Sequence, residues 1–128
     1  MNIKNLNGVI EFGTGASEYE LQGLERQLEK KLPCEYKLLL SQSNGVRHKN
    51  GLVIYAIEDV FERNETMGAI KYAAGYLSIG DDSGGRAILV PYEGTGVYIV
   101  DQGSMDPDDF DRVGASLTDW VNNGCVLP

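Results

Sequence analysis

The hexapeptide Gly80–Gly85, with the sequence GDDSGG, contains the residues whose types and spacing come nearest to a catalytic motif. It differs by one residue from the GDSGG string around the nucleophile of chymotrypsin-like proteases. Such a serine needs a histidine base and an oxyanion hole, on a scaffold much longer than this chain. The single histidine, His48, lies in the polar string Arg47-His48-Lys49, which predicts an exposed loop. This context argues against a protease.

The same hexapeptide offers oxygen atoms from Asp81, Asp82 and Ser83 that could bind a calcium ion. A calcium loop of the EF-hand type needs Asp or Asn at a series of alternate positions, and no such series follows. Glycine permits left-handed backbone conformations and aspartate tolerates them. The stretch is therefore interpreted as a tight turn between two strands, and we predict no metal site and no cofactor.

A second acidic stretch, Asp101–Arg112, contains five aspartates and one arginine, and its local charge of −4 predicts a solvated loop. Two of its carboxylates could perform acid–base catalysis only in a pocket that shifts a pKa, and the sequence indicates no such pocket. The alternative function is a docking surface for Lys and Arg side chains of a partner, with Phe110 as an apolar anchor.

The acidic residues are concentrated in the C-terminal part of the chain. The net charge is −8; residues 1–50 contribute +1 and residues 51–128 contribute −9. A negative surface repels phosphate backbones and attracts cations, which disfavours nucleic acid as a direct ligand and favours a basic protein partner. The alternative is that the acidity only keeps the protein in solution.

The composition predicts one domain that spans residues 1–128, with residues 1–15 as a lead-in segment that contains a short strand at 9–12. No stretch approaches the roughly 18 apolar residues of a membrane span, and residues 1–15 lack the apolar region of a signal peptide. We therefore expect a cytoplasmic protein without a membrane partner.

The two cysteines, Cys34 and Cys125, lie far apart in the sequence and form no C-x-x-C pair. This spacing indicates neither a disulfide framework nor a zinc site. Because a free cysteine commonly behaves as a small apolar residue, both are predicted to be buried.

Two helices are predicted in the first third of the chain. Ser17 and Glu20 form a capping-box pattern, after which leucines recur at helical spacing up to Leu32. The first helix is expected to end there, because a residue before proline avoids the α region. The second helix begins at Pro33 and ends at the Asn44-Gly45 turn.

The remainder of the chain reads as strands followed by a helix. Ser116 caps the final helix, whose predicted buried face consists of Leu117, Trp120 and Val121. The connections between the strands are too short for parallel crossovers and favour antiparallel neighbours. The predicted fold class is α+β, with N-terminal helices and a C-terminal helix packed against a mostly antiparallel sheet. The expected strands are 52–55, 76–79, 86–91 and 96–100, with a short helical segment at 57–65.

Four motifs occur in an order that resembles the Smi1/Knr4 (SUKH) superfamily, and the final helix after Ser116 completes the resemblance. The resemblance covers most of the chain, from about Ser17 to Val121. The motifs are Leu24-Glu25, Leu32-Pro33 with Tyr36-Lys37 and Leu40, Asn44-Gly45, and Ile79-Gly80-Asp81-Asp82 with Gly84-Gly85.

The resemblance implies a binding module without enzymatic activity. Bacterial members resemble immunity proteins of polymorphic toxin systems, which bind and block a cognate toxin, often a nuclease; the alternative is a regulatory scaffold domain like the fungal Smi1/Knr4 proteins. A small hydrolase is a third class, and it would need an activity that depends on Asp81 or Ser83. Because family members differ in partner, contact residues are predicted from the acidic stretches alone: Asp81, Asp82, Asp101, Asp106, Asp108, Asp109, Phe110 and Asp111.

Overall fold

A computed structural model describes residues 1–128, and its central feature is one seven-stranded antiparallel sheet. The strands follow one another in the sheet in their order along the chain, so every strand pairs with its neighbour in sequence. They are β1 (Val9–Phe12), β2 (Val46–His48), β3 (Val53–Ile54), β4 (Tyr76–Asp81), β5 (Arg86–Pro91), β6 (Val97–Asp101) and β7 (Asp111–Gly114).

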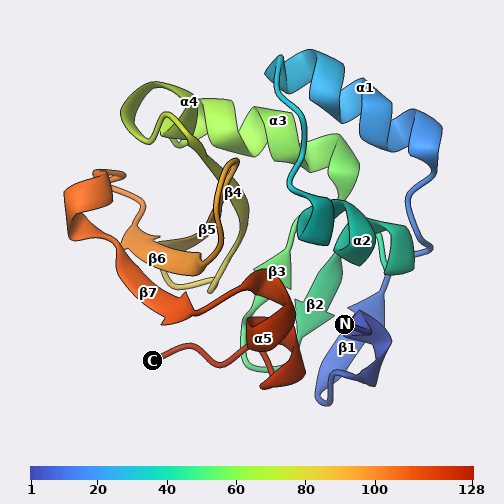
Figure 1. The fold of residues 1–128 in the computed structure, drawn as a ribbon. Coiled ribbons are helices and arrows are strands. Elements are labelled where there is room, and N and C mark those ends of the chain that lie inside the picture. The colour runs from blue at the N-terminus through green and yellow to red at the C-terminus, as the bar shows by residue number, and fades with distance from the viewer.

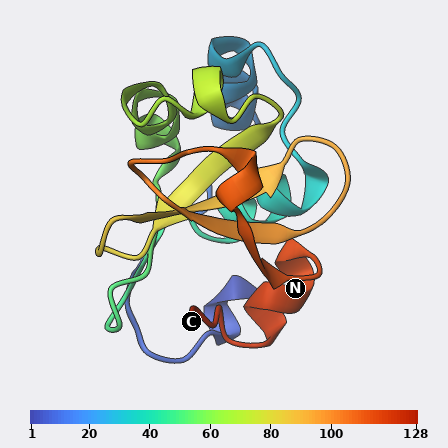
Figure 2. The ribbon, with the colours of Figure 1, turned by 90° about the vertical axis from the view of Figure 1, so that its left-hand side faces the viewer.

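Five α-helices and two 3₁₀ turns surround the sheet. Helix α1 packs against α3, both α3 and α4 pack against β4, and α2 contacts α5 and η1. Figures 1 and 2 show α1, α3 and α4 on one side of the molecule, and α5 with both chain ends on the other. The helices and turns are η1 (Ile3–Asn5), α1 (Glu18–Leu28), α2 (Cys34–Gln42), α3 (Ile57–Thr66), α4 (Ala69–Tyr72), η2 (Pro107–Asp109) and α5 (Leu117–Asn122).

The core lies on both faces of the sheet, because successive side chains of a strand point to opposite faces. On β5, Ile88 and Val90 belong to a cluster of 24 buried residues, whereas Ala87 and Leu89 belong to a second cluster of six. Residues of the α4 segment, including Ala69, cover the smaller cluster. At β4 and β5 the sheet is therefore buried on both faces.

The structure confirms the α+β fold class and several local predictions. Ser17 and Glu20 form the predicted capping box at the start of α1. Strand β5 has the predicted bounds, and β4 and β6 extend the predicted strands to Asp81 and Asp101. The sequence correctly predicts α5, with Leu117, Trp120 and Val121 buried.

The prediction for the end of the first helix was wrong. Helix α1 ends at Leu28, and Glu29 adopts a left-handed conformation with φ 56°. The Glu25 carboxylate then accepts a hydrogen bond from the Leu32 N–H at 2.8 Å, which holds the chain in a turn after the helix. Leu32 is still buried, so the leucine pattern predicted the core correctly although the helix stops earlier.

No strand was predicted between residues 12 and 52, but the structure has one there. Strand β2 includes Arg47 and His48, which were expected in a polar loop, and it pairs with both β1 and β3. The stretch Asp101–Arg112 is likewise more ordered than the predicted loop, because β7 begins at Asp111 and pairs with β6. Both strands are defined by backbone hydrogen bonds to their neighbours, and residue types alone predict such pairing poorly.

The two cysteines differ. Cys125 is buried as predicted, but Cys34 is exposed at the first position of α2, so that part of the prediction was wrong. None of the helices combines the length and apolar character needed to cross a membrane.

Candidate functional site

The hairpin between β4 and β5 is shaped by Asp82. Its Oδ1 atom accepts hydrogen bonds from the backbone N–H groups of Gly84 at 2.7 Å and Arg86 at 3.0 Å, and its Oδ2 accepts one from Arg86 Nε at 2.7 Å. Burial alone would raise the pKa of Asp82, but the hydrogen bonds from Arg86 and Gly84 hold it below its usual value. Asp82 is therefore a structural carboxylate of the predicted turn.

Asp81 is at the end of β4, only 8% exposed, and its side chain accepts hydrogen bonds from both sides. Its Oδ2 accepts from the Tyr55 hydroxyl at 2.7 Å and its Oδ1 from the Ser83 N–H at 2.9 Å. Arg63 reaches the same Oδ2 at 3.8 Å and lies 5.5 Å from the centre of the Tyr55 ring. Burial first, and then the hydrogen bond with Asp81, raise the pKa of Tyr55, which therefore keeps its proton as a donor.

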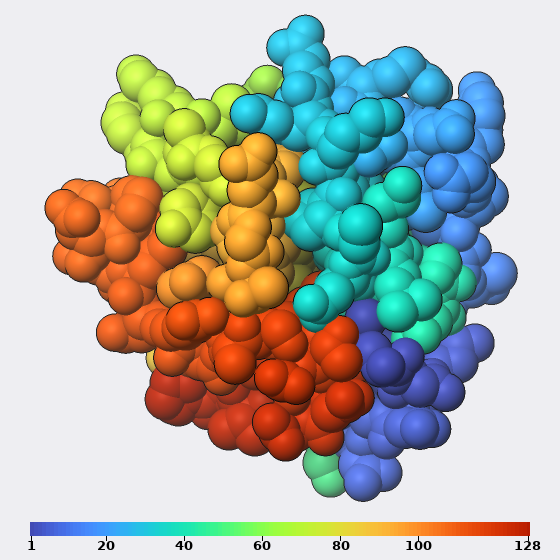
Figure 3. Space-filling view, in the orientation of Figure 1, coloured from blue at the N-terminus to red at the C-terminus, as the bar shows by residue number.

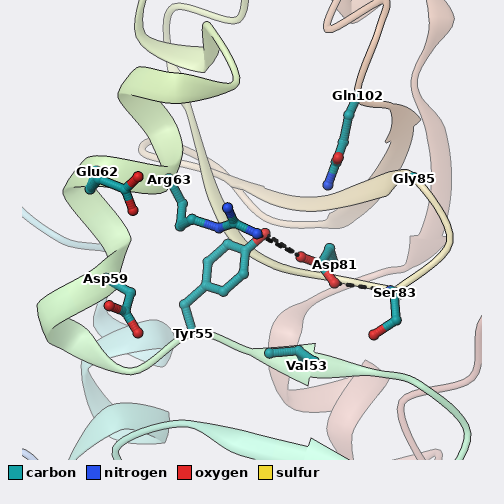
Figure 4. A pocket seen from close by; sticks show the side chains of 9 residues that line it. All are labelled: Val53, Tyr55, Asp59, Glu62, Arg63, Asp81, Ser83, Gly85 and Gln102. Carbon is teal, nitrogen blue, oxygen red and sulfur yellow. Dashed lines mark hydrogen bonds and ion pairs between the residues drawn. The ribbon is translucent and has the colours of Figure 1, made fainter.

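An open polar cleft of about 670 Å³ surrounds this cluster. Figure 4 shows Arg63 reaching from α3 toward Asp81, with Gln102 at the end of β6 on the opposite side. Asp59 and Glu62, one helical turn apart on α3, add two exposed carboxylates at its edge. The charged side chains of the lining are therefore three acids and one arginine. The nine lining residues are Val53, Tyr55, Asp59, Glu62, Arg63, Asp81, Ser83, Gly85 and Gln102.

Asn64 fixes the position of α3 over the sheet. The side chain is 1% exposed, and its amide pairs with both backbone groups of Ser78 on β4, each at 2.8 Å. It also donates to the Val60 carbonyl at 2.8 Å. A neighbouring strand would normally pair with the N–H and C=O of Ser78, but β3 is too short to reach this residue. The Asn64 amide makes these two hydrogen bonds instead. Asn64 thus holds the helix that carries Asp59, Glu62 and Arg63.

The acidic stretch after β6 is held by its own hydrogen bonds. Asp101 is exposed and accepts from the Gly103 N–H at 2.8 Å, and Asp106 caps η2 through the Asp108 N–H at 2.9 Å. Asp109 accepts a short hydrogen bond from the Ser104 hydroxyl. Asp108 and Asp111 point to solvent.

Phe110 packs within the molecule. Its ring meets the Tyr76 ring edge-on at 4.9 Å and lies 6.0 Å from the Tyr98 ring. Phe110 is half-buried, so only part of its ring remains available to another protein.

The structure brings together some of the residues predicted to bind a partner. Asp101 is paired in register with Arg86, and the Gln102 N–H donates to the Gly85 carbonyl, so Asp101 adjoins the hairpin of Asp81 and Asp82. The other predicted residues belong to η2 and β7, next to the aromatic cluster. Sequence reasoning missed the contributions of α3 to the cleft. The signal was present: Asp59, Glu62 and Arg63 share one face of a predicted helix by their spacing.

The side chains around the cleft do not form the hydrogen-bonded pair that activates a nucleophile. The Ser83 hydroxyl donates to the Gly51 carbonyl at 2.6 Å, and His48 Nε2 contacts the Asn7 carbonyl at 2.7 Å, so these two side chains do not form a nucleophile–base pair. His, Cys, Asp and Glu side chains nowhere form a group of three that could hold a metal ion. Carboxylates and hydrogen-bond acceptors with open access suit Lys or Arg side chains.

Comparison with known proteins gives a family for this arrangement. The chain is 30% identical over 83 residues to the uncharacterized protein YnaB of Bacillus subtilis (strain 168), which covers 65% of this chain and 56% of YnaB. The chain therefore spans little more than half of that relative's length. The SMI1 / KNR4 family (SUKH-1) matches residues 15–123, from the loop before α1 to the residue after α5. Because this match covers most of the chain, the protein belongs to the SMI1 / KNR4 family (SUKH-1).

Proposed function

We propose that this protein is a non-enzymatic binding module that holds a basic protein against its acidic side, and that it serves as an immunity protein for a toxin of the nuclease type. One observation carries the proposal. Of the thirteen acidic residues among 51–128, only Asp81 and Asp82 take part in an ion pair. The other eleven have no cation partner within the chain, which leaves their charge available to a partner.

A nuclease active site supports this choice of partner, because it must attract the phosphate backbone and is therefore basic. An acidic protein can cover such a site and accelerate its own association by electrostatic attraction. The cleft would receive a Lys or Arg side chain at the exposed Asp59 and Glu62. The exposed aspartates of η2 and β7, next to the aromatic cluster, would meet further cations of the partner. We place the compartment in the cytoplasm, where such a toxin would act.

A regulatory scaffold domain is the second candidate, and family membership supports it equally. Both candidates bind a protein, but only an immunity protein abolishes a toxic activity. Capture of the partner from cells of the source organism, followed by expression of that partner with and without this chain, separates them. The immunity proposal expects growth arrest by the partner alone and normal growth when both are present. A harmless partner would support the scaffold.

The electrostatic part of the proposal can be tested with a charge variant. We expect Asp→Asn at positions 106, 108, 109 and 111 together to slow association with the captured partner on the order of tenfold at low ionic strength. Asparagine preserves the hydrogen-bond acceptor that caps η2. A control with the same change in net charge neutralises exposed acids elsewhere, Glu11, Glu18, Glu29 and Asp119. Equal slowing by both variants would show that net charge, not this surface, drives the association.

A further inference from the structure

Four Asn-Gly dipeptides occur in the chain, at residues 7–8, 44–45, 50–51 and 123–124. In such a pair the glycine nitrogen can attack Cγ of the asparagine, because glycine has no side chain to hinder the approach. The new N–Cγ bond closes a succinimide ring, the Cγ–Nδ2 bond breaks, and ammonia leaves with the amide proton. Water then opens the ring to aspartate or isoaspartate. The four pairs have the same sequence, so their surroundings in the fold decide which of them reacts.

Two of the four pairs are held by hydrogen bonds on both reacting groups. The side-chain oxygen of Asn44 accepts from the Ile57 N–H at 2.7 Å, and that of Asn50 accepts from the Leu52 N–H at 3.0 Å. The glycine N–H that follows each of these asparagines donates to a backbone carbonyl. To close the ring, both the side chain and the glycine nitrogen would have to give up these partners, so the fold protects these two pairs.

The pair at residues 7–8 is the least restrained of the four. Asn7 is exposed, and neither its side-chain amide nor the Gly8 N–H makes a hydrogen bond within the chain. The pair at 123–124 is intermediate: the Asn123 side chain is exposed and makes no hydrogen bond, but the following glycine N–H donates to the Val121 carbonyl at 3.0 Å. Only at residues 7–8 are both reacting groups free.

His48 makes an activating contact with the same peptide bond. Its Nδ1 accepts the Asn50 N–H at 3.1 Å, so the ring proton is on Nε2, which donates to the Asn7 carbonyl at 2.7 Å. The Gly8 nitrogen attacks after it loses its proton, and the resulting negative charge is shared with the Asn7 carbonyl oxygen. A hydrogen-bond donor on that oxygen stabilises this reactive form. Figure 3 shows the start of the chain in blue at the lower right, with part of the β2–β3 hairpin in green beside it.

We propose that Asn7 is a site of spontaneous deamidation and that His48 promotes the reaction through its hydrogen bond to the Asn7 carbonyl. Each molecule reacts once, so this is a self-modification and not the turnover of a substrate. The product carries one additional negative charge. Isoaspartate also adds one backbone atom just before Val9, which pairs with His48 in the register of β1 and β2. The proposal is independent of the protein partner proposed above.

Peptide mapping by mass spectrometry, after incubation of the folded protein in neutral buffer for several days, measures all four sites at once. We expect Asn7 to deamidate several-fold faster than Asn123, and Asn44 and Asn50 to react most slowly. In the urea-unfolded chain the four rates should lie close together. Deamidation of Asn44 or Asn50 as fast as that of Asn7 in the folded protein would overturn the proposal. So would cleavage of the chain after Asn7 without loss of ammonia, or the same lead of Asn7 in urea.

Two substitutions of His48 separate the roles of its ring nitrogens. In His48→Asn, the side-chain oxygen can replace Nδ1 as acceptor for the Asn50 N–H, but no donor reaches the Asn7 carbonyl. In His48→Gln, the longer amide can replace Nε2 as that donor. We expect His48→Asn to slow deamidation of Asn7 several-fold and His48→Gln to retain most of the wild-type rate, with the rate at Asn123 as internal reference and Trp120 fluorescence as the check of folding. An unchanged rate at Asn7 in folded His48→Asn would rule out the proposed role of His48.

Discussion

Replacement of Asn64 by alanine tests how α3 is held over the sheet. In the wild type, the Asn64 amide is the hydrogen-bond partner of the Ser78 N–H and of the Ser78 carbonyl, all in the interior. Alanine leaves both backbone groups without this partner. An unsatisfied buried polar group costs about 1–3 kcal/mol, so two such groups give an expected loss of about 2–6 kcal/mol. A small domain has only about 5–15 kcal/mol of total stability, so this change is a large fraction of it.

The loss can be measured by urea unfolding followed through the fluorescence of Trp120, the single tryptophan, which is 2% exposed in the folded state. Glu65→Ala is the matched control, because Glu65 is the exposed neighbour of Asn64 on the same helix. We expect that control to change the unfolding free energy by no more than about 0.5 kcal/mol. A loss below about 1 kcal/mol for Asn64→Ala would refute the reasoning that this amide replaces a missing strand.

Three further changes test other parts of the account. Gly80→Ala places a Cβ atom 2.1 Å from the Val53 carbonyl oxygen of the adjacent strand, so we expect a lower free energy of unfolding in urea. A variant of wild-type stability would mean that β3 can move away from β4 without cost. Ser17→Ala removes the capping box of α1 and should cost about 1 kcal/mol by the same assay, with no loss as the contrary result. Asp82→Asn tests the lowered pKa of Asp82: a carboxylate whose pKa is depressed by folding stabilises the protein above the unfolded value of about 4 and loses this effect as the pH falls through the folded pKa. The melting temperatures of variant and wild type should therefore differ most near pH 7 and converge in acid; a constant difference would argue against an ionised Asp82.

Local sequence patterns predicted the local structure well. The capping box at Ser17 involves residues three apart, and the buried face of α5 follows from the spacing of Leu117, Trp120 and Val121. These features depend on neighbours in the chain, so the sequence contains the information needed. Gly45 has the positive φ, 92°, that a glycine after a helix suggests, but it does not end α2: the helix stops at Gln42 and Ser43 is already extended.

The features that the sequence did not predict depend on residues far apart in the chain. The cleft joins Tyr55, Arg63 and Asp81, which are brought together only when α3 packs on β4. Strand β2 is identified by its two backbone partners rather than by its own three residues. The Asp81 side chain was predicted to face a partner, but most of its surface is in contact with the protein itself. The predicted contact residues that are exposed are Asp101, Asp106, Asp108, Asp109 and Asp111.

The first fourteen residues lie outside the match to the SMI1 / KNR4 family. The family covers α1 to α5, whereas η1 and β1 precede residue 15. Ile3 of η1 is nevertheless completely buried, and its N–H donates to the Gln42 side chain at 2.8 Å. Residues of the first fourteen therefore pack against α2.

The most direct test of the central claim is the salt dependence of association between this protein and its captured partner. If the unpaired carboxylates of residues 51–128 attract a basic surface, the association rate of the wild type falls steeply as sodium chloride is raised from about 20 to 500 mM, because mobile ions screen charges beyond about one Debye length. The account predicts a clearly shallower dependence when positions 106, 108, 109 and 111 carry asparagine. A wild-type rate that does not change with salt would contradict it.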